Sequence, residues 1–134
     1  MIGLALIAAV LPPTLADIVR ADTRSGPFIC WVTDVVTSEN GVRIYFNRKG
    51  GPGFVSTPNG GFRPDAVPVD PARPQEAGVE ARLGDKLFPQ NSPEDGCSLE
   101  IVRRNGQIGV RAMAYFHPVG LPAEKKTEFI PAHD

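Results

Sequence analysis

The sequence predicts an all-β fold, namely a small antiparallel sandwich or incomplete barrel built on two hairpins with a long Pro- and Gly-rich connection. Two observations support this prediction. The 134 residues include 14 Gly and 14 Pro. Together these make up about a fifth of the chain, well above the roughly 12% that the two residue types average together. Both destabilise helix interiors, which argues against a helical bundle. The β-branched and aromatic residues gather in short runs bounded by turn residues, as is typical of strands.

The N-terminal segment, residues 1–16, contains no charged side chain. Its apolar run, residues 2–11, has the length of the hydrophobic region of a secretory signal peptide, and it is too short to span a membrane. A proline pair ends this run, and small residues follow at the positions of a cleavage site. We therefore expect residues 1–16 to be a signal peptide and residues 17–134 to form a single small exported β-domain. Because no basic residue follows Met1, a buried N-terminal segment is the alternative.

Cys30 and Cys97 are the two cysteines of the chain, and both follow the expected signal peptide. An even number of cysteines in a small exported domain indicates a disulfide, because oxidising compartments preserve such bonds. A bridge here would close a loop of roughly 68 residues and stabilise the fold by about 4 kcal/mol in the chain-entropy model. The alternative is a pair of buried thiols. No motif predicts a cofactor or a metal site.

The first hairpin is expected within residues 28–46. The run from 28 to 36 is rich in β-branched and aromatic residues and predicts a strand that is buried on both faces. Asn40-Gly41 then offers the pair favoured in two-residue hairpin turns. Residues 42–46 return as the second strand, with alternate apolar side chains on one face.

The second hairpin is centred on Asn105-Gly106, between runs at residues 98–104 and 107–116. If this pair forms a type I′ turn, Arg104 lies opposite Gln107 and the register of the whole hairpin follows. The further cross-strand pairs are then Ile101 with Val110, Leu99 with Ala112, Cys97 with Ala114, and Glu100 with Arg111. Cys97 would thus point to the apolar side of the hairpin, toward the buried strand that carries Cys30.

Residues 50–74 connect the two hairpins and hold many of the Gly and Pro residues. Prolines at three- or four-residue spacing favour extended, polyproline-like structure and cannot lie in a central strand. Residues 79–83 predict a short strand. Residues 127–130 predict an edge strand that ends at Pro131.

Two features are candidates for a binding surface. Arg103 and Arg104 at the hairpin tip would attract a polyanion or an acidic partner protein. Phe54 and Phe62 in the Pro/Gly segment could anchor a partner, because long loops and exposed aromatic side chains often bind partners. The simpler interpretations are a solvated turn for the arginines and packing onto the sheet for the two aromatic rings.

The net charge of −1 argues against a nucleic-acid-binding protein, which usually has a basic excess. We therefore expect an exported, non-enzymatic β-domain that binds a protein or an envelope component, with no transmembrane span and no nucleic-acid partner. One alternative is an inhibitor that inserts the Pro/Gly segment into a secreted hydrolase. Another is a small hydrolase that uses His117 with a neighbouring carboxylate.

Overall fold

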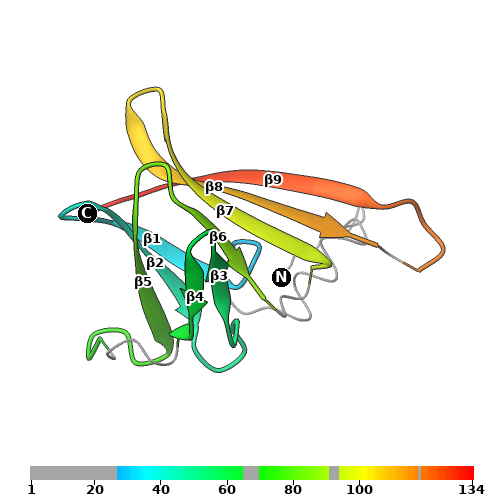
Figure 1. Cartoon of the computed structure of the whole chain (residues 1–134), viewed down its shortest axis with the longest axis horizontal. Coiled ribbons are helices and arrows are strands. Elements are labelled where there is room, and N and C mark those ends of the chain that lie inside the picture. Colours follow the sequence, from blue (N-terminus) through cyan, green and yellow to red (C-terminus); the bar gives the residue numbers. More distant parts are fainter. Residues whose placement is uncertain (1–26, 65–69, 91–93, 118) are drawn as a thin grey trace, which may run out of the picture.

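The computed structural model describes residues 27–64, 70–90, 94–117 and 119–134, so the expected signal peptide lies outside the described residues. Nine strands form in the described part of the chain (Figure 1). They are β1 (Val32–Ser38), β2 (Gly41–Asn47), β3 (Val55–Thr57), β4 (Gly60–Phe62), β5 (Glu76–Arg82), β6 (Lys86–Pro89), β7 (Gly96–Arg104), β8 (Gln107–Phe116) and β9 (Glu124–Pro131).

These strands form two antiparallel sheets that share one apolar core. The small sheet has the order β1-β2-β5, and the large sheet has the order β4-β3-β6-β7-β8-β9. The all-β prediction is therefore confirmed, and the arrangement corresponds to the sandwich rather than to a closed barrel. The largest fully buried side chains come from both sheets and from the turn before β1: Phe46, Ile29, Ile44, Leu99 and Ile101.

The second hairpin has the register that its sequence predicts. Arg104 pairs with Gln107, and each of the other expected cross-strand pairs is present. Asn105 and Gly106 have φ angles of 51° and 81°, the left-handed conformation that a type I′ turn requires at both central positions. A local turn signal thus set the pairing of two long strands.

The first hairpin differs from its prediction in two ways. Strand β1 begins at Val32, and the residues before it form a turn in which Cys30 and Trp31 have φ angles of 65° and 66°. Ser38 pairs with Gly41, so the turn is centred on Glu39-Asn40 instead of Asn40-Gly41. Gly41 is the first residue of β2 and pairs with Ser38 and Arg82. The position requires glycine, because a Cβ there would lie 2.2 Å from the carbonyl oxygen of Ala81 on β5.

The Pro/Gly segment contributes more regular structure than expected. Strands β3 and β4 form a short hairpin inside it, and β3 pairs with β6, a strand that the sequence did not predict. The expected strand at residues 79–83 is the second half of β5, and the expected edge strand lengthens into β9. Residues 65–69 of this segment lie outside the described residues.

Backbone contacts join the two sheets at both of their adjoining edges. After β9 the chain crosses to the small sheet, where the Thr37 amide donates to the His133 carbonyl at 2.8 Å and the His133 amide donates to the Val35 carbonyl at 3.2 Å. Figure 1 shows the C-terminus beside the β1–β2 hairpin. At the other edge, the turn between β5 and β6 bonds to Ile101, with Gly84 donating to its carbonyl at 2.9 Å.

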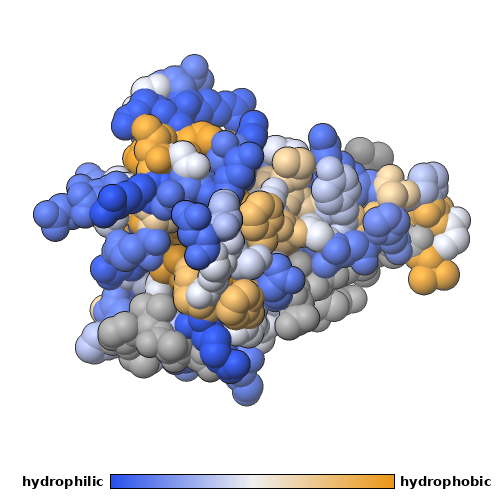
Figure 2. All heavy atoms as spheres, in the orientation of Figure 1, coloured by the Kyte–Doolittle hydropathy of each residue, from blue (hydrophilic) through white to orange (hydrophobic). Residues whose placement is uncertain are grey.

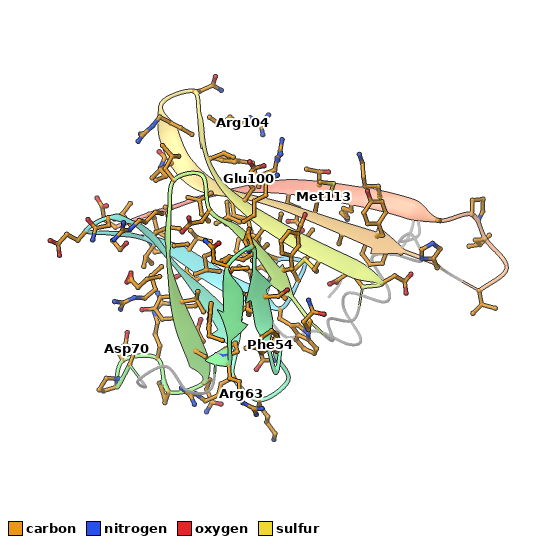
Figure 3. The ribbon with its side chains drawn as sticks, in the orientation of Figure 1. Phe54, Arg63, Asp70, Glu100, Arg104 and Met113 are labelled. Carbon is orange, nitrogen blue, oxygen red and sulfur yellow. A yellow bond between two sulfur atoms is a disulfide. The ribbon has the colours of Figure 1, made fainter. Side chains whose placement is uncertain are left out.

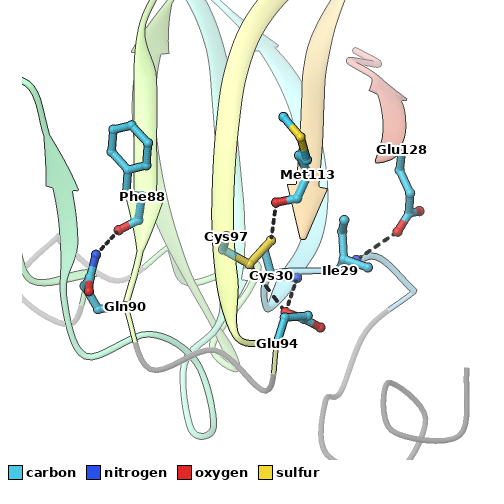
Figure 4. Close-up of a disulfide and its surroundings, with 8 residues drawn as sticks. All are labelled: Ile29, Cys30, Phe88, Gln90, Glu94, Cys97, Met113 and Glu128. Atoms are coloured by element: carbon cyan, nitrogen blue, oxygen red, sulfur yellow. Dashed lines mark hydrogen bonds between the residues drawn. A yellow bond between two sulfur atoms is a disulfide. The ribbon is translucent and has the colours of Figure 1, made fainter. Parts of the chain in front are cut away.

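The Cys30–Cys97 disulfide links the turn before β1 to strand β7, which confirms the expected pairing (Figure 4). Cys30 is completely buried. Its amide donates to the Glu94 carboxylate at 3.1 Å, and the neighbouring Ile29 amide donates to Glu128 at 3.1 Å. The turn is therefore fixed to the large sheet by one covalent bond and two carboxylates. No helix in the described ranges is long and apolar enough to cross a membrane.

Reduction of the disulfide is expected to destabilise the domain, because it releases a long closed loop. The chain-entropy model gives about 4 kcal/mol, which corresponds to a fall of about 15 °C in the melting temperature. Calorimetry of the oxidised protein, the reduced protein and a Cys30→Ser/Cys97→Ser variant measures this effect. Equal melting temperatures for the oxidised and reduced forms would contradict a stabilising role for the bond.

Candidate functional site

The outer face of the large sheet carries charged and aromatic side chains. Leu99, Ile101 and Val110 point into the core, so the alternate positions of the same strands point outward. Pairing between β7, β8 and β9 then brings outward side chains from three strands into common rows. The outward residues are Ser98, Glu100, Val102, Arg104, Arg111, Met113, Tyr115, Lys125, Thr127 and Phe129.

A hollow of about 490 Å³ lies on this face beside the β7–β8 turn. We call it the arginine groove, and its lining residues are Val102, Arg103, Arg104, Arg111, Thr127 and Phe129. Figure 3 shows Arg104 at the end of the projecting hairpin, with Glu100 and Met113 farther along the sheet. The groove thus contains Arg103 and Arg104, which the sequence analysis predicted as a binding surface, together with four residues that it did not predict.

Arg103 and Arg104 form no ion pair with a carboxylate of the described residues. The guanidinium of Arg104 lies over the Phe129 ring, 5.5 Å from its centroid. Arg103 is in hydrogen-bond range of the Gly106 carbonyl only at the limit of 3.5 Å. Arg104 projects from the outer face and Arg103 follows the opposite side of the strand at the groove edge, so two exposed positive charges flank the hairpin tip without an ion-pair partner among the described residues.

Arg111 is held differently, because it forms an ion pair with Glu100 directly across the strand pair. Lys86 on β6 lies opposite Glu100 on its other side. One carboxylate thus stands between two cations on the exposed sheet. Arg111 keeps a fixed position at the groove wall, although its charge is largely balanced.

Phe129 owes its position to Gly109 on the adjacent strand. A Cβ at Gly109 would lie 2.8 Å from the Phe129 ring, so the ring packs directly against the glycine backbone. On its other side the ring faces the Arg104 guanidinium. Phe129 is therefore a fixed, half-exposed aromatic surface next to positive charge.

The two aromatic residues of the Pro/Gly segment lie elsewhere. Phe62 packs against the core, and it also borders a separate hollow of about 380 Å³. Phe54 is 40% exposed and covers Gly61 of the neighbouring strand. Figure 3 shows Phe54 and Arg104 far apart on the molecule. Arg103 and Arg104 both line the arginine groove, whereas Phe54 and Phe62 lie outside it.

His117 does have a carboxylate partner. Its Nδ1 lies 2.5 Å from Asp95 Oδ2, and the two side chains are 63% and 49% exposed. An aspartate on Nδ1 is how a catalytic base is oriented, with Nε2 left for a nucleophile. Within the described ranges, however, no serine, threonine or cysteine side chain bonds to His117. The pair supplies two of the three parts that a hydrolase of this kind needs.

Cys30, Cys97 and Glu94 place three ligand-type atoms within 4.8 Å of one another. The two sulfur atoms are bonded to each other and are not thiolates, which are the form of cysteine that binds metals. Glu94 is buried and accepts the Cys30 amide. In this oxidised state the cluster therefore has a structural role.

A polar network covers the outer face of the small sheet, and the sequence did not reveal it. Asp34 accepts from Arg73 Nη2 at 2.6 Å and lies 2.8 Å from His133 Nε2. Arg73 also contacts Glu76 and lies over the Tyr45 ring, 4.1 Å from the centroid. Burial opposes ionisation of Asp34, but hydrogen bonds from His133, Arg73 and the Val35 amide outweigh it and lower the pKa of this carboxyl group.

The depressed pKa of Asp34 gives a stability that depends on pH. The contribution is present above the ordinary carboxyl pKa of 3.8 and is lost as the pH falls through the lower pKa of the folded state. At pH 7 we expect Asp34→Asn to lower the free energy of unfolding by about 1 kcal/mol. The difference from the unaltered protein should shrink below about pH 4.

Denaturant unfolding at several pH values measures this difference. Glu39→Gln, on the exposed β1–β2 turn, is the matched control and should change stability little at any pH. A destabilisation by Asp34→Asn that is equal at pH 7 and pH 3 would show that the carboxylate charge is not its cause.

Comparisons of this chain with protein-family models, curated proteins and solved structures found no match. Its function is therefore inferred from the geometry of its own residues. The residues that sequence reasoning missed are Val102, Arg111, Thr127 and Phe129 as members of the groove. Phe129 lies opposite Arg111 in the pairing of β9 with β8, and no turn signal in the sequence sets that register.

Proposed function

We propose that the protein is an exported, non-enzymatic β-domain that binds an anionic component of the cell envelope in the arginine groove. The observation that supports this proposal is that Arg103 and Arg104, which have no ion-pair partner among the described residues, line one groove with the half-buried ring of Phe129. Arginine binds carboxylate and phosphate groups with paired hydrogen bonds, and it also packs well on aromatic rings. The groove combines both kinds of contact.

The distribution of charge also supports the proposal. The whole chain has a net charge of −1, so the positive charge of the groove is a local feature. A local field of this kind attracts an anionic ligand to one place on the surface, and salt weakens the attraction. The β7–β8 hairpin that carries the arginines is rigidly paired, so little order is lost when a ligand binds.

Export is supported by two independent features. The disulfide is of the kind that persists in oxidising compartments outside the cytosol. The uncharged segment of residues 1–16 has the apolar run of a signal peptide.

The hydrolase that uses His117 is the second candidate function, because the contact between His117 and Asp95 favours it. Both side chains are open to solvent, which gives little protection to a reacting group. The inhibitor hypothesis remains a prediction, since part of the segment that would be inserted lies outside the described residues.

The groove predicts a defined response to charge removal. Arg103→Gln/Arg104→Gln should weaken binding to heparin, a model polyanion, by at least about tenfold, because two charge-assisted contacts are lost. Lys49→Gln/Arg82→Gln removes the same charge from exposed positions away from the groove and should weaken binding less than about twofold. Titration calorimetry with melting controls measures both variants. Equal losses in the two variants would indicate nonspecific attraction and contradict the groove.

Export predicts a processed N-terminus. When the full chain is expressed with a secretion system, we expect the mature protein to begin at Asp17 and to occur in the exported fraction with its cysteines oxidised. Intact-mass measurement after fractionation shows the N-terminus and the disulfide together. A protein that retains Met1 and stays in the cytoplasm would contradict export while leaving the groove untouched.

A further inference from the structure

The outer face of β8 and β9 continues the arginine groove along the sheet. Strand pairing places Arg111 opposite Phe129, Met113 opposite Thr127, and Tyr115 opposite Lys125. We call these six residues the β8–β9 strip. Successive rows are about 7 Å apart, because side chains on one face of a strand repeat every two residues. The strip is therefore about 14 Å long from its first row to its last, and the row of Tyr115 and Lys125 lies about 7 Å beyond the groove.

Uncompensated charge lies at both ends of this surface. At one end are Arg103 and Arg104, and at the other end Lys125 forms no ion pair with any described carboxylate. Between them the charge of Arg111 is balanced by Glu100. A ligand that satisfies both ends must therefore carry negative charges separated by more than one row of the strip.

The residues between the charged ends offer flat and polar contacts. Phe129 is half-exposed, and Tyr115 is 47% exposed in the last row. Thr127 adds a hydroxyl group between them, where it borders the groove. Figure 2 shows, on the face that it draws, hydrophobic side chains set among hydrophilic ones. The electron-rich face of an aromatic ring favours contact with positively polarised hydrogens, such as those on the face of a sugar ring.

These features together select among anionic ligands. An acidic peptide would pair with the arginines and with Lys125, but it would have no flat ring to place on Phe129 and Tyr115. A small anion would occupy the groove alone and leave the far end of the strip unused. A chain of acidic sugars supplies negative groups at intervals, ring faces between them, and hydroxyl groups for Thr127.

We propose that the arginine groove and the β8–β9 strip bind an acidic polysaccharide, with its anionic groups on Arg103, Arg104 and Lys125 and its sugar rings on Phe129 and Tyr115. This inference rests on the proposed function, because it names the class of ligand for the same groove. Several weak contacts along one chain give a useful affinity through effective concentration.

The experiment uses polygalacturonate as the probe, since each of its sugars carries a carboxylate. Dextran is the neutral polysaccharide control, and poly-L-glutamate is the acidic peptide control. Titration calorimetry of the folded, oxidised domain with each polymer gives the affinities. The variants are Phe129→Leu, which removes the ring, Phe129→Tyr, which keeps it, Lys125→Gln, and Arg103→Gln/Arg104→Gln.

We expect polygalacturonate to bind and dextran not to bind. Phe129→Leu should weaken polygalacturonate binding at least about fivefold, because stacking on a ring is lost, while Phe129→Tyr should retain it. Arg103→Gln/Arg104→Gln should weaken binding at least about tenfold. Lys125→Gln should reduce the dependence of the affinity on salt, and this readout holds even where Phe129→Leu lowers the melting temperature.

Two results would overturn the inference, and they differ in what they leave standing. If poly-L-glutamate binds as tightly as polygalacturonate and Phe129→Leu changes neither affinity, the ligand class is wrong, although the arginine groove still binds anions. If heparin, polygalacturonate and poly-L-glutamate all fail to bind, or if Arg103→Gln/Arg104→Gln leaves their binding unchanged, the proposed function fails as well.

Discussion

The fold depends on how one short turn is held between the two sheets. The turn before β1 has two successive residues, Cys30 and Trp31, in the left-handed backbone conformation, which costs a non-glycine residue about 1 kcal/mol or more. Such a conformation persists only when its surroundings fix it. Here the bond to Cys97 and the carboxylates of Glu94 and Glu128 do so. Because the turn is fixed, Ile29 reaches the core and β1 starts in line with β2.

The same constraint leaves the outer face of the large sheet open to solvent. Its inner face is occupied by the shared core. The small sheet is attached to it through the disulfide, through the turn between β5 and β6, and through the backbone of His133. The sheet therefore does not need to bury its outer side chains to be stable. Arg104 can remain exposed and Phe129 half-buried at fixed positions, so the ligand that we propose would meet a surface that is already arranged.

The parts that the sequence predicted well are those set by local signals. Asn105-Gly106 determines its own turn, and the alternation of the flanking residues then fixes every pair from Arg104–Gln107 to Cys97–Ala114. The turn at Cys30 was missed because its apolar, β-branched neighbourhood favours a strand and only distant partners override that preference. The sequence predicted only the arginines of the groove, because its other members join them through distant strand pairing. Arg103 and Arg104 are adjacent in sequence, whereas Phe129 joins them through the pairing of β9 with β8 across residues 117–123, for which no local turn signal set the register.

The placement of charge gives a physical reason why a binding surface would sit at the tip and outer face of this hairpin. Arg103 and Arg104 lie beyond the core, where water weakens the repulsion between the two like charges. A ligand that enters the groove displaces some of this water, and the same two charges then favour an anion more strongly than they would in solution. Phe129 contributes to this effect, since its ring and Gly109 form an apolar floor under the Arg104 guanidinium. An arginine pair on a plain solvated turn would lack such a floor, and that difference separates the groove from an ordinary charged hairpin tip.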